Sequence, residues 1–129
     1  MDSIDPESLG VLGDLYFWGV GDGHLGMDKA SAFEHYETAY ETFDYVGDFP
    51  GKKTFDMGKA RIAYMLGYMT FNGVGTIQDT EKAVLYYQDA VQRGEKKAIK
   101  PLANCYLNGI GVNKDINRYN ELMSMIEKA

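Results

Sequence analysis

The stretch LGYMTFNGVGTIQDTEKAVLYYQDAVQRG, residues 66–94, decides the fold because the chain holds further copies of it. Shifted by 36 residues, it aligns with LANCYLNGIGVNKDINRYNELMSMI, which starts at Leu102. Leu66, Gly73, Gly75 and Asp79 then coincide with residues of the same kind at positions 102, 109, 111 and 115. Self-similarity at a period of about 20–50 residues is the signature of a solenoid. The sequence therefore predicts an array of helix–turn–helix repeats.

A third, more divergent copy precedes these two. Asp5-Pro6-Glu7 is typical of a helix start, and apolar residues then recur at helical spacing, which predicts a first helix over about 6–18. DKASA at 28–32 matches DTEKA at 79–83, so Asp28 is expected to cap a second helix. This copy is 18 residues longer than the others, mostly near GDFPGKKTFDMG at 47–58. We interpret the extra length as a hairpin that projects beyond the solenoid, although a surface loop of no function tolerates such length equally well.

Taken together, these patterns predict one all-α domain, residues 1–129, with three repeats and six helices. Repeat one covers about 6–45 with the hairpin insertion at about 41–56, repeat two about 57–94 and repeat three about 96–129. The later helices are expected near 54–71, 79–93, 97–108 and 115–127. Pro101 lets the fifth helix begin near Ile99, because a first helical turn tolerates proline. The last helix should keep a polar face, as arrays need at their ends; its polar residues are Asn117, Asn120 and Glu121.

Composition and charge narrow the function classes. No run approaches the roughly 18 apolar residues of a membrane span, and the acidic, polar N-terminus does not resemble a secretory signal. One cysteine, Cys105, cannot form an internal disulfide, which fits a reducing compartment, so we expect a cytoplasmic protein without membrane contact. We also expect a bacterial origin. Residues 1–50 carry a net charge of −10 and residues 51–129 a net charge of +4. The acidic half cannot supply a basic face for nucleic acid, whereas opposite charges would favour weak head-to-tail association between copies.

Motifs of known chemistry are absent from the sequence, which has no G-x-S-x-G, H-E-x-x-H, C-x-x-C or phosphate-loop pattern. The G-x-G elements join two helices and recur in each repeat, which favours structural turns over phosphate binding. His24 and His35 have no second ligand at metal spacing. We therefore predict no catalytic residue, no metal and no cofactor. An enzyme, most plausibly a hydrolase, is the weaker alternative.

The repeat motif resembles the Sel-like repeat (SLR) family, which is related to the tetratricopeptide repeats. Its glycines, caps and packing residues in the second copy are Leu66, Gly67, Gly73, Gly75, Asp79, Lys82, Ala83, Tyr86, Tyr87 and Ala90. The resemblance implies a right-handed α/α superhelix. The third copy departs from this motif, because it has Ala103 in place of the first glycine. In some members a cysteine pair links the helices of each repeat. A single cysteine excludes that subtype, so we do not expect the hydrolase activity reported for it.

In the tetratricopeptide relatives, the first helix of each repeat lines a concave groove. This geometry implies partner-binding positions that the repeat motif leaves unspecified: Asp14, Phe17, Trp18, Arg61, Tyr64, Tyr68, Phe71, Asn72, Lys97, Lys100, Asn104, Leu107 and Asn108. Large aromatic and arginine side chains dominate interface energetics, and Asn amides can hold a peptide backbone. The resemblance thus implies a non-enzymatic scaffold for a protein or peptide. An inhibitor of a bacterial toxin and a self-associating structural protein are the alternatives, and Tyr64 and Phe71 can instead serve only to pack neighbouring repeats.

Overall fold

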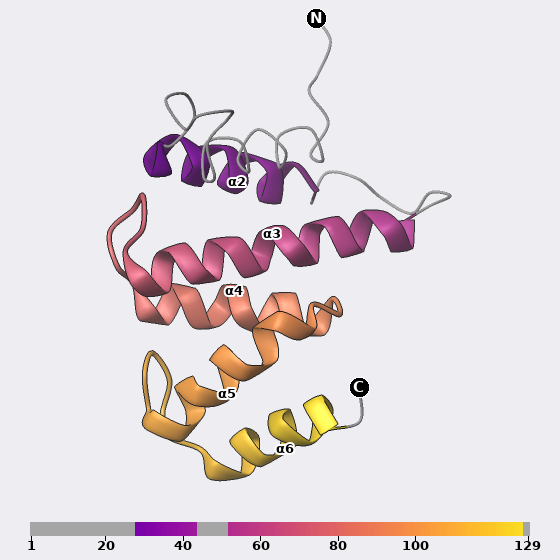
Figure 1. Cartoon of the computed structure of the whole chain (residues 1–129), viewed down its shortest axis with the longest axis vertical. Helices are drawn as coiled ribbons and strands as arrows, with labels where there is room; N and C mark the ends of the chain where they lie inside the picture. Colours follow the sequence, from indigo (N-terminus) through magenta and orange to yellow (C-terminus); the bar gives the residue numbers. More distant parts are fainter. Residues whose placement is uncertain (1–27, 44–51, 128–129) are drawn as a thin grey trace, which may run out of the picture.

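The computed structural model describes residues 28–43 and 52–127 of the chain. This part is helical throughout its regular structure and contains α2 (Lys29–Phe43), α3 (Lys52–Asn72), α4 (Thr80–Gln92), the 3₁₀ turn η1 (Lys96–Ala98), α5 (Ile99–Asn108) and α6 (Ile116–Glu127). The predicted first helix at 6–18 and the tip of the predicted hairpin lie outside the described residues. The helices stack as a column from α2 to α6, in which α3 packs most extensively on α4 and α5 on α6 (Figure 1). This arrangement is the solenoid that the repeat predicts.

In repeats two and three, whose inter-helix loops the structure describes, the first helix ends at a left-handed glycine. Gly73 and Gly109 have φ values of 69° and 67°, a conformation that glycine adopts without the steric cost of a Cβ atom. The same pair of backbone hydrogen bonds then closes each loop: Val74 N to Met69 O at 2.9 Å and Asp79 N to Thr70 O at 2.8 Å in repeat two, and Ile110 N to Cys105 O at 2.9 Å and Asp115 N to Tyr106 O at 2.9 Å in repeat three. The 36-residue period of the sequence is therefore also a period of the backbone structure.

The second helix of each repeat begins at a capping aspartate, as predicted. Asp28, Asp79 and Asp115 each accept a hydrogen bond on a side-chain oxygen from the backbone N–H three residues later, at 3.1, 3.1 and 3.0 Å. These bonds satisfy backbone donors that would otherwise have no partner at the helix start. At Asp28, hydrogen bonds from the side chain and the backbone of Ser31 lower the pKa of the carboxyl group.

The second glycine of the G-x-G element provides contact between repeats in the two loops that the structure describes. A Cβ atom at Gly75 would collide with the carbonyl group of Lys29, at the start of α2. A Cβ atom at Gly111 would collide in the same way with the carbonyl group of Thr80, at the start of α4. The loop of one repeat therefore rests on the second helix of the repeat before it. This contact explains the recurrence of the G-x-G element as a structural feature.

Two adjoining clusters of buried side chains form the core. One is centred on Tyr36 and Leu66, between α2 and α3, and the other on Leu102 and Leu122, between α5 and α6 and reaching α4. Cys105 belongs to the second cluster, and burial raises the pKa of its thiol. The small and apolar motif positions thus bury the surface between helices, which is the main favourable contribution to folding.

Helix boundaries agree with the predictions to within two residues. α5 begins at Ile99, as Pro101 indicated, after the short turn η1. α3 is 21 residues long and starts at Lys52, two residues earlier than expected. α6 exposes its predicted polar residues, but it also exposes the apolar residues Ile116, Met125 and Ile126. Its outer face is therefore less uniformly polar than we predicted. None of the helices within the described ranges combines the length and hydropathy that a membrane span needs.

Candidate partner-binding groove

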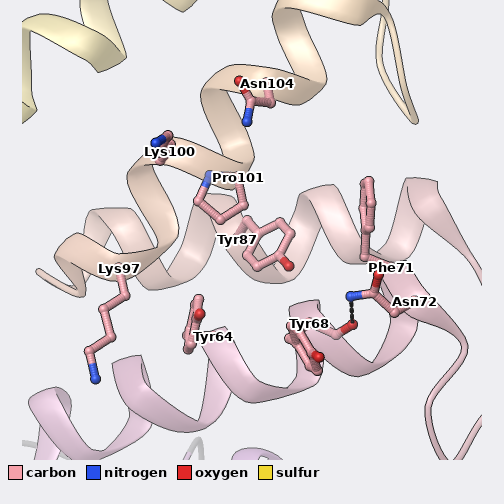
Figure 2. Close-up of a pocket in the computed structure, with 9 residues that line it drawn as sticks. All are labelled: Tyr64, Tyr68, Phe71, Asn72, Tyr87, Lys97, Lys100, Pro101 and Asn104. Atoms are coloured by element: carbon pink, nitrogen blue, oxygen red, sulfur yellow. Dashed lines mark hydrogen bonds between the residues drawn. The ribbon is translucent and has the colours of Figure 1, made fainter.

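A hollow of about 460 Å³ opens between α3 and α5, with α4 behind it (Figure 2). We call it the α3–α5 groove and define it by its lining residues, which are Tyr64, Tyr68, Phe71, Asn72, Tyr87, Lys97, Lys100, Pro101 and Asn104. Seven of these nine residues are among the predicted partner-binding positions. Its volume lies within the range of about 300–1,000 Å³ that is typical of ligand pockets.

The floor of the groove is aromatic. Tyr87 of α4 is only 2% exposed, and its burial raises the pKa of the phenol, which keeps it neutral. Gly67 makes room for this ring, because a Cβ atom there would lie 2.7 Å from the Cδ1 atom of Tyr87. The rings of Tyr64 and Phe71 pack beside it, with centroids 6.2 and 6.4 Å away. Tyr64 and Phe71 therefore both support the core and line the groove.

The wall that α3 contributes ends in an amide. Tyr68, one turn after Tyr64, is 41% exposed. One turn further, Asn72 donates a 2.9 Å hydrogen bond from its side-chain nitrogen to the carbonyl oxygen of Tyr68 (Figure 2). An asparagine amide has two N–H donors and one acceptor oxygen, so this bond fixes the side chain while leaving one donor and the acceptor toward a ligand.

The opposite wall is basic and polar. Lys97 in η1, and Lys100 and Asn104 in α5, are all exposed and follow one another at helical spacing. Pro101 lies between them, and its ring faces the groove beside Tyr87 (Figure 2). No acidic side chain is among the nine lining residues. The groove thus combines an apolar floor with a positively charged wall.

Three of the other predicted positions are described by the structure and lie outside this groove. Arg61, Leu107 and Asn108 are described by the structure but do not line the hollow. Asn108 instead donates a 3.1 Å hydrogen bond from its side chain to the carbonyl oxygen of Asn104, which repeats the bond between Asn72 and Tyr68. Asp14, Phe17 and Trp18 lie outside the described residues, so their predicted role stays a prediction.

Two lining residues were not predicted as site residues. Tyr87 was assigned to packing and Pro101 to a helix start, and both assignments are correct for the fold. Their place in the groove depends on how far apart α3 and α5 lie above α4, and the repeat pattern does not show this opening. The only sequence signal is that repeat two keeps a glycine opposite Tyr87, at Gly67.

A separate polar cluster joins α2, α3 and α4. The hydroxyl of Tyr40 donates a 2.7 Å hydrogen bond to Asp89, which also accepts a 2.9 Å bond from Arg93. The amine of Lys59, only 3% exposed, lies 4.4 Å from the centre of the Tyr40 ring. Among the described residues, no group of three or more His, Cys, Asp or Glu side chains is placed to hold a metal ion.

Successive helix pairs joined by equivalent glycine loops define an all-helical repeat protein of the solenoid class. The family model of the Sel1 repeat matches residues 6–41, 60–95 and 102–118, which together exceed half of the chain. The chain therefore belongs to the Sel1 repeat family. Sel1 repeats generally mediate protein–protein interactions and typically act as non-enzymatic scaffolds.

Two solved structures are similar to this chain. A Sel1 repeat protein from Oxalobacter formigenes superimposes with a TM-score of 0.74 and is 25% identical, over 93% of this chain and 42% of that protein. A protective antigen of uropathogenic Escherichia coli strains with an SLR fold gives a TM-score of 0.53 and 19% identity, over 95% of this chain and 30% of that protein. The second likeness bears on the fold alone. This chain spans less than half the length of either protein.

Proposed function

We propose that this protein is a non-enzymatic interaction scaffold that binds a protein or peptide segment in the α3–α5 groove. The observation that carries the proposal is the meeting of seven motif-independent side chains around one hollow. Motif positions maintain the solenoid, whereas the side chains of Tyr68, Lys97, Lys100 and Asn104 are exposed and contribute little to the core. Tyrosine is enriched among the residues that dominate binding energy at interfaces.

A photo-crosslinking experiment tests this proposal. A benzophenone amino acid is placed at position 68, on the groove wall, and in a matched control at position 85, where Leu85 is 64% exposed and outside the groove. We expect irradiation in native lysate to attach a defined protein to the groove probe and not to the control probe. The double substitution Tyr68→Ala/Asn104→Ala should then remove that protein from affinity capture.

Equal crosslinking from both probes would contradict a role for the groove. Equal capture by wild type and the Tyr68→Ala/Asn104→Ala variant would contradict it as well. Circular dichroism spectra of all variants establish that the solenoid is intact, since both substituted side chains are exposed. Inhibition of a bacterial toxin and structural self-association remain narrower predictions; the protein identified by crosslinking distinguishes them, because self-association would attach a second copy of this chain.

A further inference from the structure

The charge of the α3–α5 groove indicates the chemistry of its partner. Lys97 and Lys100 are exposed, three residues apart on one wall, and neither forms an ion pair with a described residue. By contrast, the amine of Lys82 in α4 lies 3.7 Å from the carboxylate of Glu37 in α2. Two unpaired cations beside a neutral aromatic floor favour a ligand that carries negative charge.

The aromatic floor of the groove favours a ligand that also carries an apolar group. The rings of Tyr64, Phe71 and Pro101 are only partly buried and line the groove around the buried Tyr87, and burying their remaining apolar area is favourable at about 25 cal/mol per Å². A lone phosphate or carboxylate would leave these rings in contact with water. The ligand should therefore place an apolar or aromatic side chain on the floor, next to its negative charge.

The amide groups on the two walls of the groove suit a peptide backbone. Asn72 keeps one N–H and its oxygen available beyond its bond to Tyr68, and the side chain of Asn104 makes no hydrogen bond with a described residue. In Figure 2 Asn72 lies at the Phe71 end, Asn104 lies on the α5 wall above Tyr87, and Lys97 lies at the Tyr64 end. An extended chain has both donors and acceptors to offer the amides, so it can run between the two ends.

We infer that the groove takes an extended acidic segment of a partner protein in which an apolar or aromatic residue lies close to an Asp, a Glu or a C-terminal carboxylate. The negative charge of the segment pairs with Lys97 or Lys100, its apolar side chain lies between Tyr64 and Pro101, and its backbone contacts Asn72 and Asn104. This inference rests on the proposed function and makes it specific. A nucleic acid is a poorer fit, because only two cations line the groove and its affinity comes mainly from neutralising many phosphates.

The test is a selection of random peptides displayed on phage against the immobilised full chain, followed by binding measurements on synthetic peptides that it enriches. We expect enriched sequences to be acidic and to carry an aromatic or large aliphatic residue. Lys97→Glu/Lys100→Glu should weaken binding about tenfold, because each exposed ion pair changes affinity by less than about fivefold and charge reversal adds repulsion. Lys97→Arg/Lys100→Arg keeps both charges and should retain most of the affinity.

Enrichment of neutral or basic peptides, or no enrichment above background, would overturn the inference. Equal binding when each Asp and Glu of the peptide is replaced by its amide would also overturn it. Displacement of the peptide by an oligothymidylate, or by inorganic phosphate alone, would assign the lysines to another anion and overturn it as well. The variant Tyr68→Ala/Asn104→Ala separates this failure from failure of the proposed function. Peptides that need Tyr68 and Asn104 but not the lysines leave the groove as the binding site and refute only its acidic specificity.

Discussion

The hydroxyl of Tyr40 in α2 donates a 2.7 Å hydrogen bond to the carboxylate of Asp89 in α4, across 49 residues of sequence. The bond joins the second helices of two successive repeats directly. The Tyr40 ring also meets Tyr86 edge to face, with centroids 5.4 Å apart. Aromatic packing and a charged acceptor thus act together at one contact between repeats, in addition to the repeated loop contacts.

Tyr40→Phe should destabilise the protein by about 1.5–3 kcal/mol, the range for hydrogen bonds to charged groups. The substitution keeps the ring and removes only the donor. Tyr106→Phe is the comparison: its hydroxyl accepts a 2.8 Å bond from the neutral amide of Gln88 and also interacts with the partly exposed Arg118 guanidinium, and its loss should cost about 1 kcal/mol. Urea unfolding followed by circular dichroism measures both; an equal or smaller loss for Tyr40→Phe would contradict the prediction.

Gly67→Ala should lower the free energy of unfolding even though alanine is the better helix former by about 1 kcal/mol. The new Cβ atom would lie 2.7 Å from Cδ1 and 3.2 Å from Cγ of Tyr87, and overpacking costs about 1–3 kcal/mol. Repeat three carries Ala103 and Met123 at the equivalent positions. Gly67→Ala/Tyr87→Met should therefore recover stability relative to Gly67→Ala alone, and additive losses in this double-mutant cycle would refute the contact.

The two glycines of the third-repeat loop should respond differently to alanine. Both have left-handed φ values, 67° at Gly109 and 71° at Gly111, which cost an ordinary residue about 1–2 kcal/mol. A Cβ atom at Gly109 would meet nothing closer than 3.5 Å, whereas one at Gly111 would lie 2.7 Å from the carbonyl carbon of Thr80. Gly111→Ala should thus lower the thermal midpoint more than Gly109→Ala, and the reverse order would exclude the proposed contact between repeats.

Stability should fall between pH 10 and pH 12 partly through Tyr86. Burial first, and then the nearby charges of Glu37 and Glu41, raise the pKa of this phenol to about 12. The unfolded chain loses the proton near pH 10 while the folded chain still holds it, so unfolding becomes more favourable as pH rises through this window. Tyr86→Phe cannot titrate and should show a shallower decline in thermal midpoint over the same pH range; parallel declines would contradict the assignment.

Most of the fold is predictable from the sequence because the signals are local. A capping aspartate binds a backbone N–H three residues away, and a left-handed glycine ends a helix next to it. Both need only a few consecutive residues, so Asp28, Asp79, Gly73 and Gly109 identify the described helix boundaries to within two residues. The first helix and the hairpin tip lie outside the described residues and stay predictions.

The candidate site is predictable only in part. Tyr64, Tyr68, Phe71, Asn72, Lys97, Lys100 and Asn104 come together because first helices of adjacent repeats share one surface, which the repeat geometry already implied. Arg61 follows the same positional rule but does not line the hollow. A rule based on spacing cannot tell how far each side chain reaches or how closely two repeats approach.

The sequence by itself determined the 36-residue repeat and the helical class, and the resemblance to tetratricopeptide repeats implied most residues of the two walls of the α3–α5 groove. Tertiary structure alone decided that Tyr87 forms the floor and that Tyr40 reaches Asp89. The physical reason is that caps and turns depend on neighbouring residues in the chain, whereas the depth and charge of a groove depend on the distance between helices. That distance is fixed by packing contacts such as the one between Gly67 and Tyr87, which exist only once the repeats are stacked.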